Sequence, residues 1–131
     1  MADLNDLPLL ITKHCRITPA PEDGTRILTM RRWPRGVRRD RFDVWLRDLA
    51  PSEGLLKWCW AEEANPQFDP ERYERTWKAR YVAEMQAQQP LINDLRRRHR
   101  AGETLTLLCA CHDPARCHRA VLASLIVGHA S

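Results

Sequence analysis

The segment from Cys109 to Arg119 holds the densest group of residues that could do chemistry. It reads Cys-Ala-Cys-His-Asp-Pro-Ala-Arg-Cys-His-Arg and so combines thiols, imidazoles and guanidinium groups. The thiolate is the reactive form of cysteine, and nearby positive charge favours it. Arg116 and Arg119 supply that charge and are suited to holding a phosphate. We therefore predict Cys117 and His118 as candidate catalytic residues, and Arg116 and Arg119 as ligand-binding residues.

Two other interpretations of this segment stay open. Cysteine and histidine residues close together in sequence are typical of zinc sites. The residues of that kind here are Cys109, Cys111, His112, Cys117 and His118. The chain has no Cys-x2-Cys pair, so we assign no metal ligand and expect no cofactor. The plainest interpretation makes Cys109 a small core residue and His118 a hydrogen-bonded helix residue.

A second group of charged residues lies between positions 31 and 41 and contains six arginines. It includes the turn Trp33-Pro34-Arg35-Gly36, which proline and glycine make stiff. An aromatic ring among arginines can stack on a base while the guanidinium groups hold phosphate. Arg32, Trp33 and Arg35 are therefore predicted ligand-binding residues. The alternative is a solvated loop whose arginines pair with the aspartates of residues 40–48, a weak kind of interaction.

Both charged segments follow predicted strands. Short apolar or β-branched runs over 9–12, 26–31 and 104–111 indicate strands, and the last is apolar enough for the middle of a sheet. In open α/β folds, ligands bind where the carboxyl ends of such strands meet. We therefore predict one site for a phosphate-bearing ligand, a nucleotide or nucleic acid, where the 111–119 loop meets the 33–36 turn.

Capping residues and apolar spacing predict two long helical segments. Residues 69–71 supply an N-cap aspartate, a first-turn proline and a first-turn acid, so a helix begins there. Its large apolar side chains recur every four residues, which predicts a buried face of Tyr73, Trp77, Tyr81 and Met85. Pro90 interrupts this helix. A further helical segment continues from there and ends in a basic turn before Gly102.

Three shorter helices are predicted from capping residues. Asp40 is a good N-cap, and the apolar residues at 42, 45, 46 and 49 would share one helical face. Ser52 begins a second short helix. Asp113 and Pro114 begin the last helix, whose apolar positions at 121, 122, 125 and 126 would face a core.

The length and the order of elements predict the fold class. A chain of 131 residues has the usual size of one domain and can bury one hydrophobic core. The order strand, strand, helices, strand, helix indicates an α/β fold. We expect a single small, three-layer-like domain over 1–131, with a short, mainly parallel sheet flanked by helices.

Composition excludes some classes of protein. No run approaches the roughly 18 apolar residues of a membrane span, and the acidic residues 1–6 do not resemble a signal peptide. The five cysteines are an odd number, which fits thiols in a reducing compartment better than a set of disulfides. We therefore expect a cytoplasmic protein with no membrane partner. The sequence does not indicate an oligomeric state.

The net charge of +4 supports an alternative function. The arginine-rich patch could make the chain a non-enzymatic module that binds nucleic acid or protein. That alternative predicts binding that weakens with salt and survives Cys117→Ala.

Three stretches resemble the YeaO-like family of uncharacterised bacterial proteins. They are Glu-Asp-Gly-Thr-Arg-Ile-Leu at 22–28, Arg-Trp-Pro-Arg-Gly at 32–36 and Trp-Leu-Arg-Asp-Leu-Ala-Pro-Ser at 45–52. The likeness extends over nearly the whole chain, and Cys-His-Arg at 117–119 is similar to a sister branch of the same superfamily. The resemblance implies a compact α/β fold and supplies no substrate.

Two residues depart from the family pattern. Met30 stands where members with this turn usually carry aspartate, and Cys111 stands where the sister branch tends to have glutamate. If those acids serve a reaction in the family, the resemblance implies that this chain has lost or changed it.

Overall fold

A parallel sheet of four strands organises the computed structural model, which describes residues 10–110 and 117–128. The strands are β1 (Leu10–His14), β2 (Thr25–Leu28), β3 (Val44–Trp45) and β4 (Leu105–Cys109), in the order β1-β4-β2-β3. Leu107 of β4 is in register with Thr12 on one side and Ile27 on the other. The α/β class and the central place of the apolar run are therefore confirmed.

The described residues form α-helices at four places, α1 (Glu53–Glu63), α2 (Pro70–Gln86), α3 (Gln89–Arg100) and α4 (His118–Val127). Ser52 caps α1, its hydroxyl accepting from the Leu55 amide at 3.1 Å, and Asp69 caps α2. Pro90 lies in the first turn of α3, as expected. The predicted start at Asp113 lies outside the described residues. None of these helices combines the length and apolarity needed to cross a membrane.

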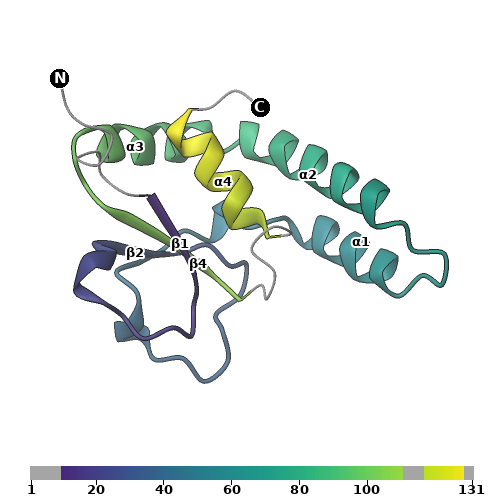
Figure 1. Cartoon of the computed structure of the whole chain (residues 1–131), viewed down its shortest axis with the longest axis horizontal. Helices are drawn as coiled ribbons and strands as arrows, with labels where there is room; N and C mark the ends of the chain where they lie inside the picture. Colours follow the sequence, from purple (N-terminus) through teal and green to yellow (C-terminus); the bar gives the residue numbers. More distant parts are fainter. Residues whose placement is uncertain (1–9, 111–116, 129–131) are drawn as a thin grey trace.

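Side chains of the strands alternate between two cores, one on each face of the sheet. Ile27 and Leu107 pack on one face with buried residues of all four helices. Leu28 and Leu108 pack on the other face with loop residues between 30 and 45. In Figure 1 the helices gather on one side of the strands and these loops on the other, with α1 and α2 side by side as a hairpin. The layer opposite the helices therefore consists of loops and short 3-10 turns.

The predicted helix after Asp40 is wrong. Residues 39–41 and 47–49 form single 3-10 turns, and β3 lies between them. The edge of β2 offers unpaired backbone groups, and the Leu46 amide donates to the Leu28 carbonyl at 2.9 Å. The Asp43 carboxylate also accepts from the Arg26 amide at 2.7 Å. Because Val44 and Trp45 favour extended backbone, this pairing outweighs the helical spacing of the apolar residues.

The four-residue stripe on α2 is core packing, as predicted. Tyr73, Trp77, Tyr81 and Met85 are all buried. The Tyr81 hydroxyl donates to the Leu49 carbonyl at 2.7 Å, which ties α2 to the turn before α1. This stripe packs α2 onto the helical face of the sheet.

A tight turn brings the chain into β2. Gly24 has φ +62° and ψ −133°, a combination open almost only to glycine. The following amide, of Thr25, donates to the Thr104 carbonyl at 3.0 Å, and a Cβ on Gly24 would overlap that same carbonyl. The glycine therefore permits the close approach that aligns β2 with β4.

Candidate functional site

Two cysteine sulfurs meet at the carboxyl end of the central strand. Cys109 is the last residue of β4, and Cys117 is the N-cap residue of α4. Their Sγ atoms lie 2.6 Å apart, and both residues are buried. The strand and the helix that follows it therefore bring together two thiols that are eight residues apart in sequence.

Arg119 places a buried positive charge beside this thiol pair. Its Nη1 donates to the carbonyls of Lys13 at 2.8 Å and Cys109 at 3.3 Å, and lies 3.4 Å from the Cys109 Sγ. The residue is only 4% exposed, and no carboxylate among the described residues lies within ion-pair distance of it. A guanidinium stays charged, and a buried charge needs compensation. Within the described residues, two backbone carbonyls and the Cys109 sulfur are the acceptors that surround it.

His118 faces the thiol pair with a defined tautomer. Its Nε2 lies 2.7 Å from the Thr29 carbonyl oxygen, which can only accept, so Nε2 carries the proton. Nδ1 therefore has a lone pair, and it lies 3.8 Å from the Cys117 Sγ. Burial lowers the pKa of His118, because it disfavours the imidazolium, so the ring is neutral at pH 7.

Two neighbours hold the imidazole in place. The Thr29 hydroxyl donates to the Leu108 carbonyl at 3.1 Å, so its lone pairs can face Nε2 of His118 at 3.2 Å. The Tyr81 ring packs edge-on to the imidazole with a centroid distance of 5.6 Å. Burial raises the pKa of Tyr81 well above its usual range, so its hydroxyl stays protonated. These contacts orient Nδ1 toward sulfur.

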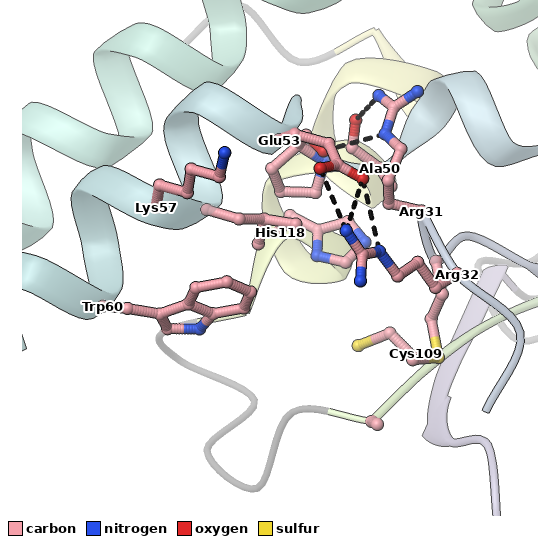
Figure 2. Close-up of a pocket in the computed structure, with 12 residues that line it drawn as sticks. Arg31, Arg32, Ala50, Glu53, Lys57, Trp60, Cys109 and His118 are labelled. Atoms are coloured by element: carbon pink, nitrogen blue, oxygen red, sulfur yellow. Dashed lines mark hydrogen bonds and ion pairs between the residues drawn. The ribbon is translucent and has the colours of Figure 1, made fainter. Parts of the chain in front are cut away.

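A pocket of about 340 Å³ opens beside Cys109 and His118, which contribute to its lining. In Figure 2, Lys57 and Trp60 of α1 lie on one side, and Arg32 and Cys109 on the other. Trp60 is 60% exposed, which is unusual for a side chain of its size. The pocket thus joins a buried thiol to a rim that carries an aromatic ring and cations.

Arg32 is already partnered at this rim. Its Nη2 lies 3.0 and 3.1 Å from the two carboxylate oxygens of Glu53. Both side chains are exposed, so the pair costs little to open. Neighbouring Arg31 instead anchors the start of α1, donating to the carbonyls of Ala50 and Pro51 at 3.1 and 3.2 Å.

The structure brings only some of the predicted site residues together. Arg32 and His118 line the pocket, and Arg119 lies against Cys109. The Trp33 ring packs edge-on against neighbouring aromatic rings, and its Nε1 donates to the Val37 carbonyl at 2.7 Å. Arg35 is exposed in the loop layer and does not line the pocket. Arg116 and Cys111 lie outside the described residues.

Sequence reasoning gave no catalytic role to Cys109 and overlooked Trp60. Cys109 shares a face with Leu107, two residues earlier, and so points toward the helices and α4. Trp60 lies two residues after Trp58, which packs against the core, so the helical rotation turns Trp60 outward. The alternation of side chains along a strand indicates where Cys109 points, and the rotation per residue of a helix indicates that Trp60 faces outward.

Three of the candidate zinc ligands do come together. The ligand atoms of Cys109, Cys117 and His118 all lie within 4.8 Å of one another, and all three residues are buried. Two thiolates and an imidazole form a donor set that zinc takes in proteins, leaving a fourth position for water or substrate. The cluster could therefore hold a soft divalent metal.

We expect acid to destabilise the fold, because the folded chain holds His118 in its neutral form. The pKa of this group is lower in the folded chain than the ordinary 6.5, so below that pH the unfolded chain binds a proton that the native chain does not. Its contribution to the free energy of unfolding is fully present above pH 6.5 and is lost as the pH falls through the lower folded pKa.

His118→Gln should flatten this pH dependence, because the glutamine amide can still donate to the Thr29 carbonyl but takes up no proton. Urea denaturation of both proteins between about pH 7 and pH 5 measures the two slopes. Equal slopes would show that His118 does not carry the effect.

Comparison with known proteins assigns the chain to a family. A family model described as the active DUF488-N3 subclade matches residues 10–130. Uncharacterized proteins of Mycobacterium tuberculosis and Mycobacterium bovis are 34% identical over 110 residues, covering 82% of this chain and 85% of each relative. No solved structure shows a significant match. The chain therefore belongs to the DUF488 family, in agreement with its YeaO-like sequence features.

Proposed function

We propose that this protein is an enzyme that uses the Cys109 thiolate as a nucleophile on a phosphate-bearing ligand. The observation that carries the proposal is the contact of the buried Arg119 guanidinium with the Cys109 Sγ, at 3.4 Å, beside a pocket that Cys109 lines. Positive charge next to a thiol favours the thiolate, and the thiolate is the nucleophilic form.

The other buried groups have complementary roles in this proposal. The Cys117 thiol, 2.6 Å away, donates to the Cys109 thiolate and shares its charge. The Cys109 sulfur would bond to an electrophilic phosphorus or carbon of the ligand while the leaving group departs with its electron pair. Water would then release the adduct and restore the thiolate, with Nδ1 of neutral His118 taking the proton.

The rim of the pocket suits a ligand that has both a flat ring and an anion. Lys57 and Trp60 are three residues apart on α1, so they lie side by side. A base can stack on the exposed Trp60 ring while Lys57 faces a phosphate. Arg32 can exchange Glu53 for that phosphate, because both groups offer oxygen pairs to the guanidinium fork. A nucleotide is the simplest ligand of this kind.

Alkylation by iodoacetamide tests the proposal. Cys59 is the internal reference, since it is half-buried and burial raises the pKa of its thiol. At pH 7 we expect Cys109 to be alkylated at least about tenfold faster than Cys59. Iodide is the leaving group, and peptide mass spectrometry measures the rate at each cysteine. Saturating AMP should slow the alkylation of Cys109 and leave the alkylation rate of Cys59 unchanged.

Two results would contradict the proposal. Alkylation of Cys109 at or below the rate of Cys59 would exclude the nucleophile. If Cys109 is alkylated rapidly but AMP protects it no better than adenosine or inorganic phosphate does, the ligand is not a nucleotide. Lys57→Ala combined with Trp60→Ala should abolish the AMP protection. Lys78→Ala is the control, because Lys78 is a partly buried lysine of α2 that pairs with Glu74 and does not line the pocket.

The convergence of Cys109, Cys117 and His118 favours a second candidate, a zinc-stabilised domain. The guanidinium at 3.4 Å from the Cys109 Sγ counts against it, because it would repel a divalent cation beside the same sulfur. Metal analysis of the purified protein separates the two functions. Stoichiometric zinc that slows alkylation of Cys109 would favour the metal, and its absence would remove this candidate.

A further inference from the structure

We infer that Cys109 and Cys117 form a reversible dithiol–disulfide couple, in which Cys117 resolves a mixed disulfide that first forms on Cys109. The oxidant is a small disulfide of the glutathione class. The inference rests on the proposed function, since it takes Cys109 as the sulfur that reacts first. It adds a second activity to the same site, thiol–disulfide exchange.

The two sulfurs are already close to bonding distance. Their 2.6 Å separation exceeds a disulfide bond by about half an ångström. One residue ends β4 and the other precedes the first turn of α4, so each belongs to an element that the core holds in place. Bond formation therefore asks for a small adjustment of side chains rather than a movement of the backbone.

The pocket determines the order in which the sulfurs react. Both residues are buried, Cys109 at 1% and Cys117 at 0% exposure, but Cys109 contributes to the pocket lining and Cys117 does not. Arg119 also contacts the Cys109 sulfur. An oxidant that enters the pocket therefore meets Cys109 first, and Cys117 lies behind it as the resolving thiol.

The chemistry balances without a metal. The Cys109 thiolate attacks one sulfur of oxidised glutathione, the glutathione disulfide breaks, and one glutathione leaves as a thiolate. Cys117 gives its proton to Nδ1 of His118, 3.8 Å away, and attacks the Cys109 sulfur. The second glutathione thiolate leaves. His118 passes its proton to one of the two released thiolates. The protein, a thiolate and a thiol at the start, has lost two electrons and one proton, and oxidised glutathione has become one glutathione and one glutathione thiolate.

The internal disulfide would switch off the nucleophile. Neither sulfur can be a thiolate once the bond has formed, so the negative charge beside Arg119 is lost. A reduced thiol such as glutathione reverses the steps and restores the site. The proposed enzyme activity would therefore follow the thiol–disulfide balance of its surroundings.

The test exposes the reduced protein to excess oxidised glutathione at pH 7.5 and then blocks the remaining thiols with N-ethylmaleimide. Trypsin cleaves after Arg100, Arg116 and Arg119, so Cys109 and Cys117 fall in different peptides. We expect residues 101–116 joined to 117–119 with the loss of two hydrogens, reversed by dithiothreitol. Fragmentation of the joined peptides assigns the bond to Cys109 rather than Cys111.

Variants identify the resolving thiol. In Cys117→Ser the reaction should stop at a stable glutathione adduct on Cys109. Cys117→Ala is the second variant if the serine perturbs folding. Cys59→Ser is the matched control and should give the same joined peptides as the wild type. Cys111→Ser should also keep the bond.

The possible failures are distinct. A wild-type chain that keeps glutathione on Cys109 overturns the inference and leaves the proposed nucleophile intact. A bond through Cys111 overturns it as well. A Cys109 that resists both oxidised glutathione and iodoacetamide overturns the proposed function too. A Cys109 that iodoacetamide modifies rapidly but glutathione leaves unchanged overturns only the redox couple.

Discussion

Arg119→Gln should slow the alkylation of Cys109 by iodoacetamide at pH 7 by about ten- to a hundredfold. A hydrogen bond from a charged donor is worth about 1.5–3 kcal/mol, and each 1.36 kcal/mol changes the thiolate population about tenfold. The substitution removes the buried positive charge that lies 3.4 Å from the Cys109 sulfur. Because glutamine is shorter and neutral, it can restore neither the charge nor the reach of the guanidinium.

The control for this experiment is Arg96→Gln. Arg96 also donates to two backbone carbonyls, those of Leu125 at 2.7 Å and Ile126 at 3.0 Å, and the described structure gives it no contact with sulfur. Its loss should reduce stability without changing the reactivity of Cys109. Arg119→Lys should recover part of the rate, because it keeps the charge. Equal rates for the wild type and Arg119→Gln would show that the guanidinium does not activate the thiol.

Gly24→Ala should cost about 3 kcal/mol or more of the free energy of unfolding. The new Cβ would overlap the Thr104 backbone, which cannot yield without moving the start of β4. The backbone at Gly24, with φ +62° and ψ −133°, also disfavours any side chain. Urea denaturation followed by tryptophan fluorescence measures the loss.

Gly36→Ala provides the matched control. Gly36 has φ +77°, but a Cβ there would meet no heavy atom within 4 Å. Gly36→Ala should therefore lose only the cost of holding a non-glycine residue at positive φ, about 1 kcal/mol of the free energy of unfolding. If the two variants were equally stable, contact with Thr104 would not be what makes glycine necessary before β2.

The sequence predicted the elements whose signals are local. The aspartate and proline at 69–70 start a helix through their own backbone chemistry, and the stripe from Tyr73 to Met85 needs only helical spacing to be recognised. The apolar composition of 104–111 indicates a strand with neighbours on both sides, and β4 does lie between β1 and β2. These predictions require no knowledge of distant contacts.

Residues 40–49 show where that approach fails. Their apolar spacing fits a helix, yet backbone pairing with β2 makes Val44 and Trp45 a strand. The choice depends on residues some fifteen positions earlier in the chain, which no local pattern contains. Tertiary pairing overrides propensity most readily in short segments such as this one.

Cys117 and His118 lie at the carboxyl end of the central strand, as their place in the sequence indicates, and their chemical roles stay predictions. The carboxyl end of the central strand follows from the general behaviour of α/β sheets, so the neighbourhood of Cys117 and His118 was predictable. The roles of Thr29 and Tyr81 were not, because they depend on how two other elements approach α4. The proximity of Arg119 to the Cys109 sulfur likewise depends on the packing of α4 against β1.

The position of β4 in the sheet also determines when this protein can fold. Among the described strands β4 is the last to leave the ribosome, and both β1 and β2 pair with it. Before it emerges, the only strand pair of the described sheet that can form is β2 with β3. Because β4 joins β1 to β2, the described sheet cannot form until residues 105–109 have emerged, and the long loops that it closes make this step slow. The strand that completes this sheet also carries Cys109, so the thiol pair is assembled only after β4 and the start of α4 have been synthesised.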